Sequence, residues 1–103
     1  MAMAIRGRVD PDELERYRAL DCRVILPKLA EYVKADLSFE PIHSSDTHRW
    51  HVRADGHDYE ILTTGAKWFD TRAKRGGGGA IDLAMHLYRL DFKQAIQRLR
   101  EAL

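Results

Sequence analysis

The stretch KWFDTRAKRGGGGAIDL, residues 67–83, decides the fold, because a strand pattern ends and a helix pattern begins within it. Residues Lys67 to Asp70 are predicted to form a short strand, and residues Ala80 to Leu90 a helix. Between them, the basic side chains of residues 72–75 and the four glycines of residues 76–79 predict a basic, glycine-rich loop. The inward face of the helix follows from the 3.6-residue period and comprises Ile81, Ala84, Leu87 and Tyr88.

Upstream of this stretch, apolar residues recur with a period of two, which is typical of strands. The segment WHVRADG, residues 50–56, alternates apolar and basic residues and ends in an Asp-Gly hairpin signal. The next strand is predicted from Tyr59 to Thr63, with a turn at residues 64–65. Residues Phe39 to Ile42 can add an edge strand, where a proline is tolerated. The sequence therefore predicts a small antiparallel sheet of three or four strands.

Two helices are predicted before the sheet and two after it, which makes the fold class α+β. The first covers residues 11–20, because Asp10-Pro11-Asp12-Glu13 combines an N-cap, a proline at the first helical position and a capping box. The second covers roughly residues 22–35, and Pro27 either kinks it or marks its first turn. The last helix runs from a capping box at residues 91–94 to about Ala102. The residues expected to face the core from the second and last helices are Leu26, Leu29, Ala30, Val33, Phe92, Ala95, Ile96, Leu99 and Leu103.

Length and composition restrict the class of protein. The chain of 103 residues has the length of one domain, with 45% hydrophobic and 32% charged residues. No apolar run approaches the roughly 18–20 residues that span a bilayer, so we expect no membrane association. Cys22 is the single cysteine, which excludes an intrachain disulfide and a four-cysteine zinc site and suits the cytoplasm. Residues 1–9 are expected to be a disordered N-terminus or a cloning remnant, and residues 10–103 to form the domain.

The glycine run of residues 76–79 has two interpretations. Its backbone N–H groups could approach a phosphate closely, next to the positive end of the helix that begins at Ala80. Alternatively, the run is a flexible connector between sheet and helix. It fits neither a Walker P-loop, because no Gly-Lys-Ser/Thr follows, nor a G-x-G-x-x-G motif, because no parallel βαβ unit surrounds it. Asp82, in the first turn of the helix, would repel an anion there.

Basic and aromatic residues gather around this run, although the formal net charge is only +1. Four bases lie within residues 67–75, interleaved with Trp68 and Phe69, and three further polar or basic side chains alternate within residues 49–53. Antiparallel pairing could bring both groups onto one surface. Cations for phosphates and aromatics for base stacking are typical of single-strand binding. The alternative is that the aromatic residues, Trp50 included, belong to the core and the bases to a solvated face.

Metal binding and catalysis have less support in the sequence. His48 and His51 have a spacing found in metal sites, but structural zinc requires four ligands. His86 follows Asp82 by four residues on a helix, which predicts a surface or partly buried pair. Cys22 is most simply a small core residue. We therefore expect no cofactor, no metal and no catalytic residue.

Three motifs in a fixed order carry a resemblance to a known family. They are Lys67-Trp68-Phe69-Asp70, the segment GGGGAIDL of residues 76–83, and the segment LDFKQAI of residues 90–96. This order resembles the zinc-binding domain of bacterial DnaG-type primases, where an aromatic strand, a glycine-rich turn, an Ala-Ile-Asp helix start and a Phe-x-x-Ala helix follow one another. It is more similar to the zinc-less relatives found beside Toprim domains in plasmid and mobile-element proteins. The resemblance covers roughly residues 20–103, and residues 66–100 carry most of it.

The resemblance implies a zinc-ribbon-like core without the metal. The family holds zinc with a Cys-x-x-His pair and a Cys-x-x-Cys pair. Only His48-x-x-His51 lies near the first pair, and no cysteine or histidine lies near Trp68 to Arg72, where the second would fall. Packing by Trp50, Trp68 and Phe69 is inferred to replace the metal.

The resemblance further implies binding of single-stranded template DNA on the sheet face, in replication or transfer of a plasmid or mobile element. The alternative is a protein-docking module of the same fold without DNA binding. In either case the chain is expected to be non-catalytic, and any primase-type activity would reside in a partner. The expected partner is a primase, polymerase, relaxase or Toprim-containing protein or domain. The predicted nucleic-acid-binding residues are Arg49, His51, Arg53, Lys67, Trp68, Arg72, Lys74, Arg75, Gly76 and Gly77.

Overall fold

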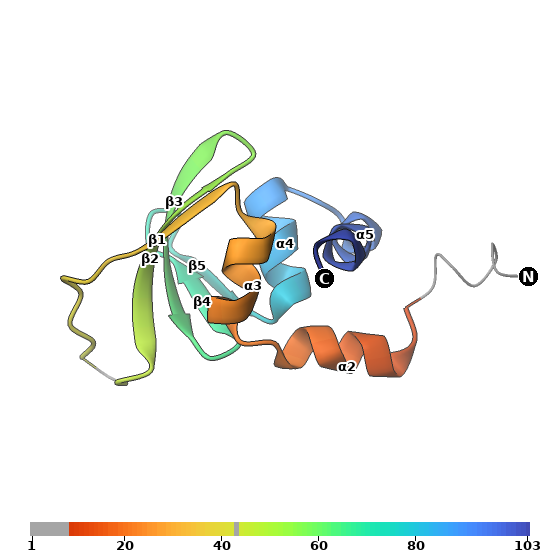
Figure 1. Ribbon diagram of the computed structural model, residues 1–103, viewed down its shortest axis with the longest axis horizontal. Helices are drawn as coiled ribbons and strands as arrows, with labels where there is room; N and C mark the ends of the chain where they lie inside the picture. Colours follow the sequence, from red (N-terminus) through yellow and green to blue (C-terminus); the bar gives the residue numbers. More distant parts are fainter. Residues whose placement is uncertain (1–8, 43) are drawn as a thin grey trace, which may run out of the picture.

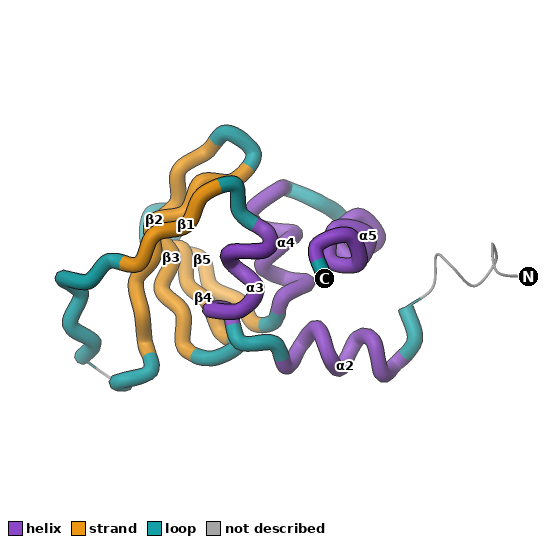
Figure 2. Tube along the Cα trace, viewed as in Figure 1, coloured by secondary structure: helices purple, strands orange, loops and turns teal. Residues whose placement is uncertain are grey.

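The computed structural model describes residues 9–42 and 44–103 and shows an α+β fold. A five-stranded antiparallel sheet has the order β1-β2-β3-β4-β5, and the helices lie on one side of it (Figures 1 and 2). The predicted fold class is confirmed, with more strands than expected. The elements are α2 (Pro11–Ala19), α3 (Cys22–Leu29), β1 (Tyr32–Ala35), β2 (Thr47–Ala54), β3 (His57–Thr64), β4 (Lys67–Asp70), β5 (Arg75–Gly78), α4 (Ala80–Tyr88) and α5 (Phe92–Ala102).

The core lies between the sheet and the helices. Helix α4 is its centre, since it packs against α2, α3, α5 and β5. Each fully buried aliphatic side chain here stabilises the fold by roughly 1.5–3 kcal/mol. Two tyrosine hydroxyls add polar links, because Tyr59 donates to the carbonyl of Leu87 and Tyr88 to that of Leu29. The largest fully buried side chains are Ile25, Leu26, Ile61, Leu83, Leu87, Ile96 and Leu99.

The two faces of the sheet differ because successive residues of a strand point to opposite sides. On β4, Trp68 and Asp70 are buried against the helices, whereas Lys67 and Phe69 are exposed on the other side. No helix in the described part of the chain covers that second side, which we call the open face (Figure 2). By strand register, the open face carries Tyr32, Lys34, Arg49, His51, Arg53, Asp58, Glu60, Leu62, Lys67 and Phe69.

The helix predicted over residues 22–35 ends at Leu29, so its second half was predicted wrongly. The N–H of Glu31 donates to the carbonyl of Arg53, and residues 32–35 pair with β2 as the edge strand β1. Val33 satisfies both patterns, because it faces the core from a strand as it would from a helix. The edge strand predicted over residues 39–42 does not form, and Ile42 there is 89% exposed.

The glycine run was also predicted wrongly, because three of its residues lie in strand β5 rather than in a loop. Gly76 is paired with Phe69, and Gly77 with Trp68. A Cβ atom at Gly77 would lie 1.9 Å from a carboxylate oxygen of Asp82 and 2.7 Å from the Trp68 ring. Glycine is therefore required for a close approach of the strand to the core.

Several local predictions are confirmed. The strand Lys67–Asp70 has the predicted bounds, and the turn at Asp55 and Gly56 joins β2 to β3 with positive φ at both residues. The capping box that starts α5 is complete, with hydrogen bonds in both directions between Asp91 and Gln94. Of residues 1–9, predicted to be disordered or a remnant, residues 1–8 lie outside the described residues, so the prediction is not tested there, whereas Val9 packs against the core and belongs with the domain.

One ion pair ties the first helix to the last. Arg100 donates to both carboxylate oxygens of Glu13, each at 2.8 Å, and the Tyr17 hydroxyl donates to Glu13 at 2.7 Å. The hydrogen bonds from Arg100 and then Tyr17 lower the pKa of Glu13 from 4.5 to about 2. Because the pKa is lowered in the folded state, this pair stabilises the fold above pH 4.5 and loses its contribution as the pH falls towards 2.

The variant Glu13→Gln is therefore expected to lose on the order of 1 kcal/mol of unfolding free energy at neutral pH. Its stability should also fall less steeply than that of the wild type as the pH drops from 4.5 to 2. Urea denaturation at neutral pH and at several values between pH 4.5 and 2 measures both effects. Glu15→Gln, an exposed change on the same helix, is the control. Equal stability and equal pH dependence of E13Q and the wild type would contradict the role of the pair.

The steric role of Gly77 predicts that Gly77→Ala destabilises the fold by about 1–3 kcal/mol, the usual range for overpacking. Gly78→Ala is the matched control, since a Cβ atom there would meet nothing within 4 Å. Thermal denaturation should show a lower midpoint for G77A alone. Equal midpoints for the two variants would show that β5 does not need to approach the core so closely.

Candidate functional site

The open face brings together residues that are distant in the sequence. Across three neighbouring strands, Arg49, Leu62 and Phe69 form one continuous row. Phe69 is 41% exposed, and Tyr32 on the far edge strand is 54% exposed. Exposed aromatic rings on a sheet provide stacking surfaces for unpaired bases. Of the predicted site residues, the register places Arg49, His51, Arg53, Lys67 and Gly76 on this face.

Two of the cations on the open face are held by acidic neighbours. Arg49 forms hydrogen bonds with Asp36 at 2.7–2.8 Å and stacks on the Phe39 ring at 5.0 Å. Hydrogen bonds from Ser38 and then Arg49 lower the pKa of Asp36 to about 2. Arg53 pairs with Asp58 at 3.2 Å. Part of the charge of these two arginines is therefore neutralised by a neighbouring carboxylate.

The other bases of the predicted site are less engaged. Arg72 donates to the backbone carbonyl of Asp58 at 3.3 Å. Lys67, Lys74 and Arg75 have no ion-pair partner among residues 9–42 and 44–103. Lys74 also lies in the turn between β4 and β5 with a positive φ of 54°. Among the predicted site residues, the unpaired positive charge thus lies on β4, in the turn that follows it and at the start of β5.

Two shallow hollows mark the open face. One, of about 330 Å³, is lined by Thr47, Leu62, Lys67 and Phe69 among others. The second, of about 200 Å³, is lined by Tyr32, His51, Asp58 and Arg72 among others. Each hollow combines an aromatic ring, on which a nucleobase can stack, with a basic side chain, which can bind a phosphate.

Trp68, Arg75 and Gly77 do not belong to this surface, because the register pairs Arg75 with the inward-facing Asp70 and Gly77 with Trp68. Trp68 is 3% exposed and stacks on His86, with 4.6 Å between the ring centroids. Because Trp68 is buried, it cannot stack on a nucleobase, and its assignment to the binding site was wrong. The alternative interpretation, that Trp68 belongs to the core, is confirmed. Gly77 faces Trp68 and Asp82 on the helix side. Of the three aromatics inferred to replace zinc by packing, Phe69 instead faces outward.

The glycine run does not present a row of free donors to a phosphate. The N–H of Gly78 donates to the carboxylate of Asp82 at 3.0 Å, and that of Gly79 to the carbonyl of Ala66 at 2.8 Å. Asp82 therefore occupies the place where an anion would meet these N–H groups beside α4.

The histidine pair with metal-like spacing is split by the strand geometry. His48 and His51 are three residues apart on β2, so their side chains point to opposite faces of the sheet. Among the described residues, no three His, Cys, Asp or Glu side chains are grouped to hold a metal ion. The Cys22 side chain is fully buried, and burial raises the pKa of its thiol to about 12, so it is not a nucleophile at neutral pH.

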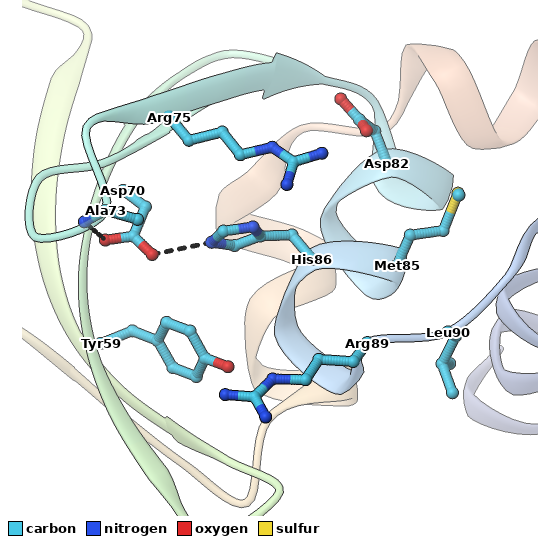
Figure 3. A pocket seen from close by; sticks show the side chains of 9 residues that line it. All are labelled: Tyr59, Asp70, Ala73, Arg75, Asp82, Met85, His86, Arg89 and Leu90. Atoms are coloured by element: carbon cyan, nitrogen blue, oxygen red, sulfur yellow. Dashed lines mark hydrogen bonds and ion pairs between the residues drawn. The ribbon is translucent and has the colours of Figure 1, made fainter.

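A pocket on the helix side was missed from the sequence. It has a volume of about 470 Å³, lies beside α4 and is lined by Tyr59, Asp70, Arg75, Asp82, His86 and Arg89 among others (Figure 3). We call it the α4 pocket. His86 pairs with Asp70 at 2.7 Å, not with Asp82 as predicted. One feature of the sequence could have indicated this pocket. The alternation in residues 67–70 places Asp70 on the same inward face as Trp68, and a carboxylate at an inward position requires polar partners.

Comparisons with known proteins give little further guidance. No protein-family model matches the chain, and no solved structure matches it. The chain is 39% identical over 57 residues to a "65 kDa protein" of Zymomonas mobilis subsp. mobilis. This match spans 55% of the chain but only 9% of that protein's length. In the described part of the chain, no helix has the length and apolar character needed to cross a membrane.

The buried Asp70 carboxylate organises the turn before β5. It accepts the N–H groups of Arg72 and Ala73, each at 3.0 Å, as well as the His86 hydrogen bond. Asp70→Ala leaves all three groups without their acceptor, so we expect the free energy of unfolding to fall by about 3 kcal/mol. Asp70→Asn keeps an acceptor for the two N–H groups and should lose less. Chemical denaturation measures the order of stabilities, and a D70A variant as stable as D70N would contradict this role.

Proposed function

We propose that this domain binds single-stranded DNA across its open face and is itself non-catalytic. The observation that carries the proposal is the uncovered sheet face, on which the exposed rings of Tyr32 and Phe69 lie among basic side chains. A single strand of nucleic acid needs such rings for its bases and cations for its phosphates. Sheet faces with exposed aromatic residues serve this purpose in other single-strand-binding modules.

The distribution of charge supports a path for the strand along β4 and the following turn. Lys67, Arg72 and Lys74 follow one another along this path, and none of them pairs with a carboxylate in the described residues. Phe69 lies between Lys67 and Arg72, so a base stacked on its ring would have phosphates close to both. Arg49 and Arg53, held by their acidic partners, would border the path.

The resemblance to zinc-less primase zinc-binding domains supports a role in replication or transfer of a plasmid or mobile element. In this role the domain would deliver template to a primase, polymerase, relaxase or Toprim-containing partner in the cytoplasm. The partner would supply the chemistry.

The proposal is tested by the fluorescence anisotropy of a labelled oligo(dT) at several salt concentrations. Phe69→Ala should weaken binding about tenfold, since the removal of one base–aromatic stack costs roughly 1–3 kcal/mol. Lys67→Ala should make the dependence of log affinity on log salt shallower by about 0.7, the slope that one neutralised phosphate of a single strand contributes. Lys93→Ala, an exposed change on α5 at the helix side, should have neither effect. Unchanged affinity of F69A and K67A, or no binding at low salt, would refute the proposal.

A docking module is the second candidate function. The observation that favours it is the loop before β2, where Leu37 is 94% exposed and Ile42 is 89% exposed. A protein partner that covers these side chains would remain bound at high salt, because apolar contacts are not screened. Salt-resistant capture that is lost in a Leu37→Ser, Ile42→Ser double variant, together with no oligonucleotide binding at low salt, would establish docking instead.

A further inference from the structure

The α4 pocket lies on the helix side of the sheet, away from the open face. Its volume of about 470 Å³ is within the range of roughly 300–1,000 Å³ found for small-molecule sites. Figure 3 shows the Arg75 and Arg89 side chains on opposite sides of the His86 ring, and both line the pocket. Tyr59, Met85 and Leu90 supply aromatic and apolar wall. The pocket therefore has both a cationic part and a part suited to an organic group.

The charges in this pocket are unevenly engaged. Both carboxylates are used by the fold, because Asp70 accepts from His86 and two backbone N–H groups and Asp82 accepts from Gly78. The guanidinium groups of Arg75 and Arg89, by contrast, have no hydrogen-bond or ion-pair partner within residues 9–42 and 44–103. Each guanidinium offers five N–H donors in a planar fork. The unused hydrogen-bonding capacity of the pocket is thus that of the two guanidinium donors, while both carboxylates keep their negative charge.

The backbone of Arg89 points to the same conclusion. This residue ends α4 in the left-handed conformation, with φ 54° and ψ 46°. Glycine is the usual residue at this position, because a side chain is disfavoured in that conformation. Arg89 adopts this conformation against its backbone preference, and such residues occur most often at functional sites.

We propose that the α4 pocket binds a phosphate monoester, with the phosphoryl group between Arg75 and Arg89. A phosphate dianion has three terminal oxygens and can accept paired hydrogen bonds from both guanidinium groups. His86, fixed by Asp70, forms the wall between them. The source of the phosphate is either a free mononucleotide or the phosphorylated end of a DNA strand. This proposal does not depend on DNA binding by the open face.

The test is NMR titration of the 15N-labelled chain with inorganic phosphate, AMP and adenosine. Phosphate and AMP should shift the backbone amide of Arg89 and the indole signal of Trp68, which stacks on His86. Adenosine should shift neither. Saturable binding of AMP but not adenosine supports the site. No saturable shift with either phosphate or AMP, or equal binding of adenosine, would overturn it.

Arg89→Gly separates binding from folding. Glycine suits the left-handed position, so the thermal midpoint of this variant should be unchanged or higher, while AMP binding falls at least tenfold. Arg75→Ala should weaken binding similarly, and Lys93→Ala should not. Full AMP binding by both R89G and R75A would overturn the proposal. R89G should still bind an oligonucleotide with a free 5′-hydroxyl, and F69A should still bind AMP. The proposal for the pocket and the proposal for the open face can therefore be refuted separately.

Comparison of oligonucleotides identifies the source of the phosphate. If a 5′-phosphorylated strand binds more than fivefold tighter than its 5′-hydroxyl counterpart, and R89G abolishes that difference, the strand end is the ligand. If AMP binds and the two strands do not differ, a free nucleotide is the ligand.

Discussion

The close approach of β5 to the core is the constraint on which the rest of the structure depends. Gly77 lies against the Trp68 ring and the Asp82 carboxylate, where a Cβ atom would clash with both. This contact places β5 beside β4 and leads the chain directly into α4, the helix at the centre of the core. It also buries Trp68 against His86, which in turn is held by Asp70. A strand, a turn and a helix are thereby fixed by side-chain packing and hydrogen bonds.

This packing leaves the sheet with helices on one side only. The alternation of β4 buries Trp68 and Asp70 and, by the same geometry, exposes Lys67 and Phe69. Strand β4 therefore contributes side chains to both the open face and the helix side, where the α4 pocket lies. The turn after β4 carries basic residues that lie near both. Here the Asp70 carboxylate organises the turn through its hydrogen bonds to Arg72 and Ala73.

Much of the fold could be predicted because local signals agreed with the final packing. The hairpin at residues 55–56, the strand Lys67–Asp70 and the capping box at Asp91 each depend on neighbouring residues alone. The prediction over residues 30–35 failed because Val33 fits a helical and a strand period equally well, and pairing with β2 decided between them. The glycine run was ambiguous for a related reason. Conformational freedom and close packing both require glycine, and only the positions of Trp68 and Asp82 separate them.

The candidate site could be predicted in part. The basic residues of β2 and β4 meet on one face, as antiparallel pairing allows, but Trp68, Arg75 and Gly77 belong to the other. The pairs of Arg49 with Asp36 and of His86 with Asp70 were beyond sequence reasoning, since each joins residues separated by a loop or a turn. The most direct test of the central claim is the proton spectrum of the aromatic rings during titration with oligo(dT). Binding on the open face predicts that the ring signals of Phe69 and Tyr32 shift while those of Tyr88 do not, whereas unchanged Phe69 and Tyr32 signals at saturating oligonucleotide would contradict it.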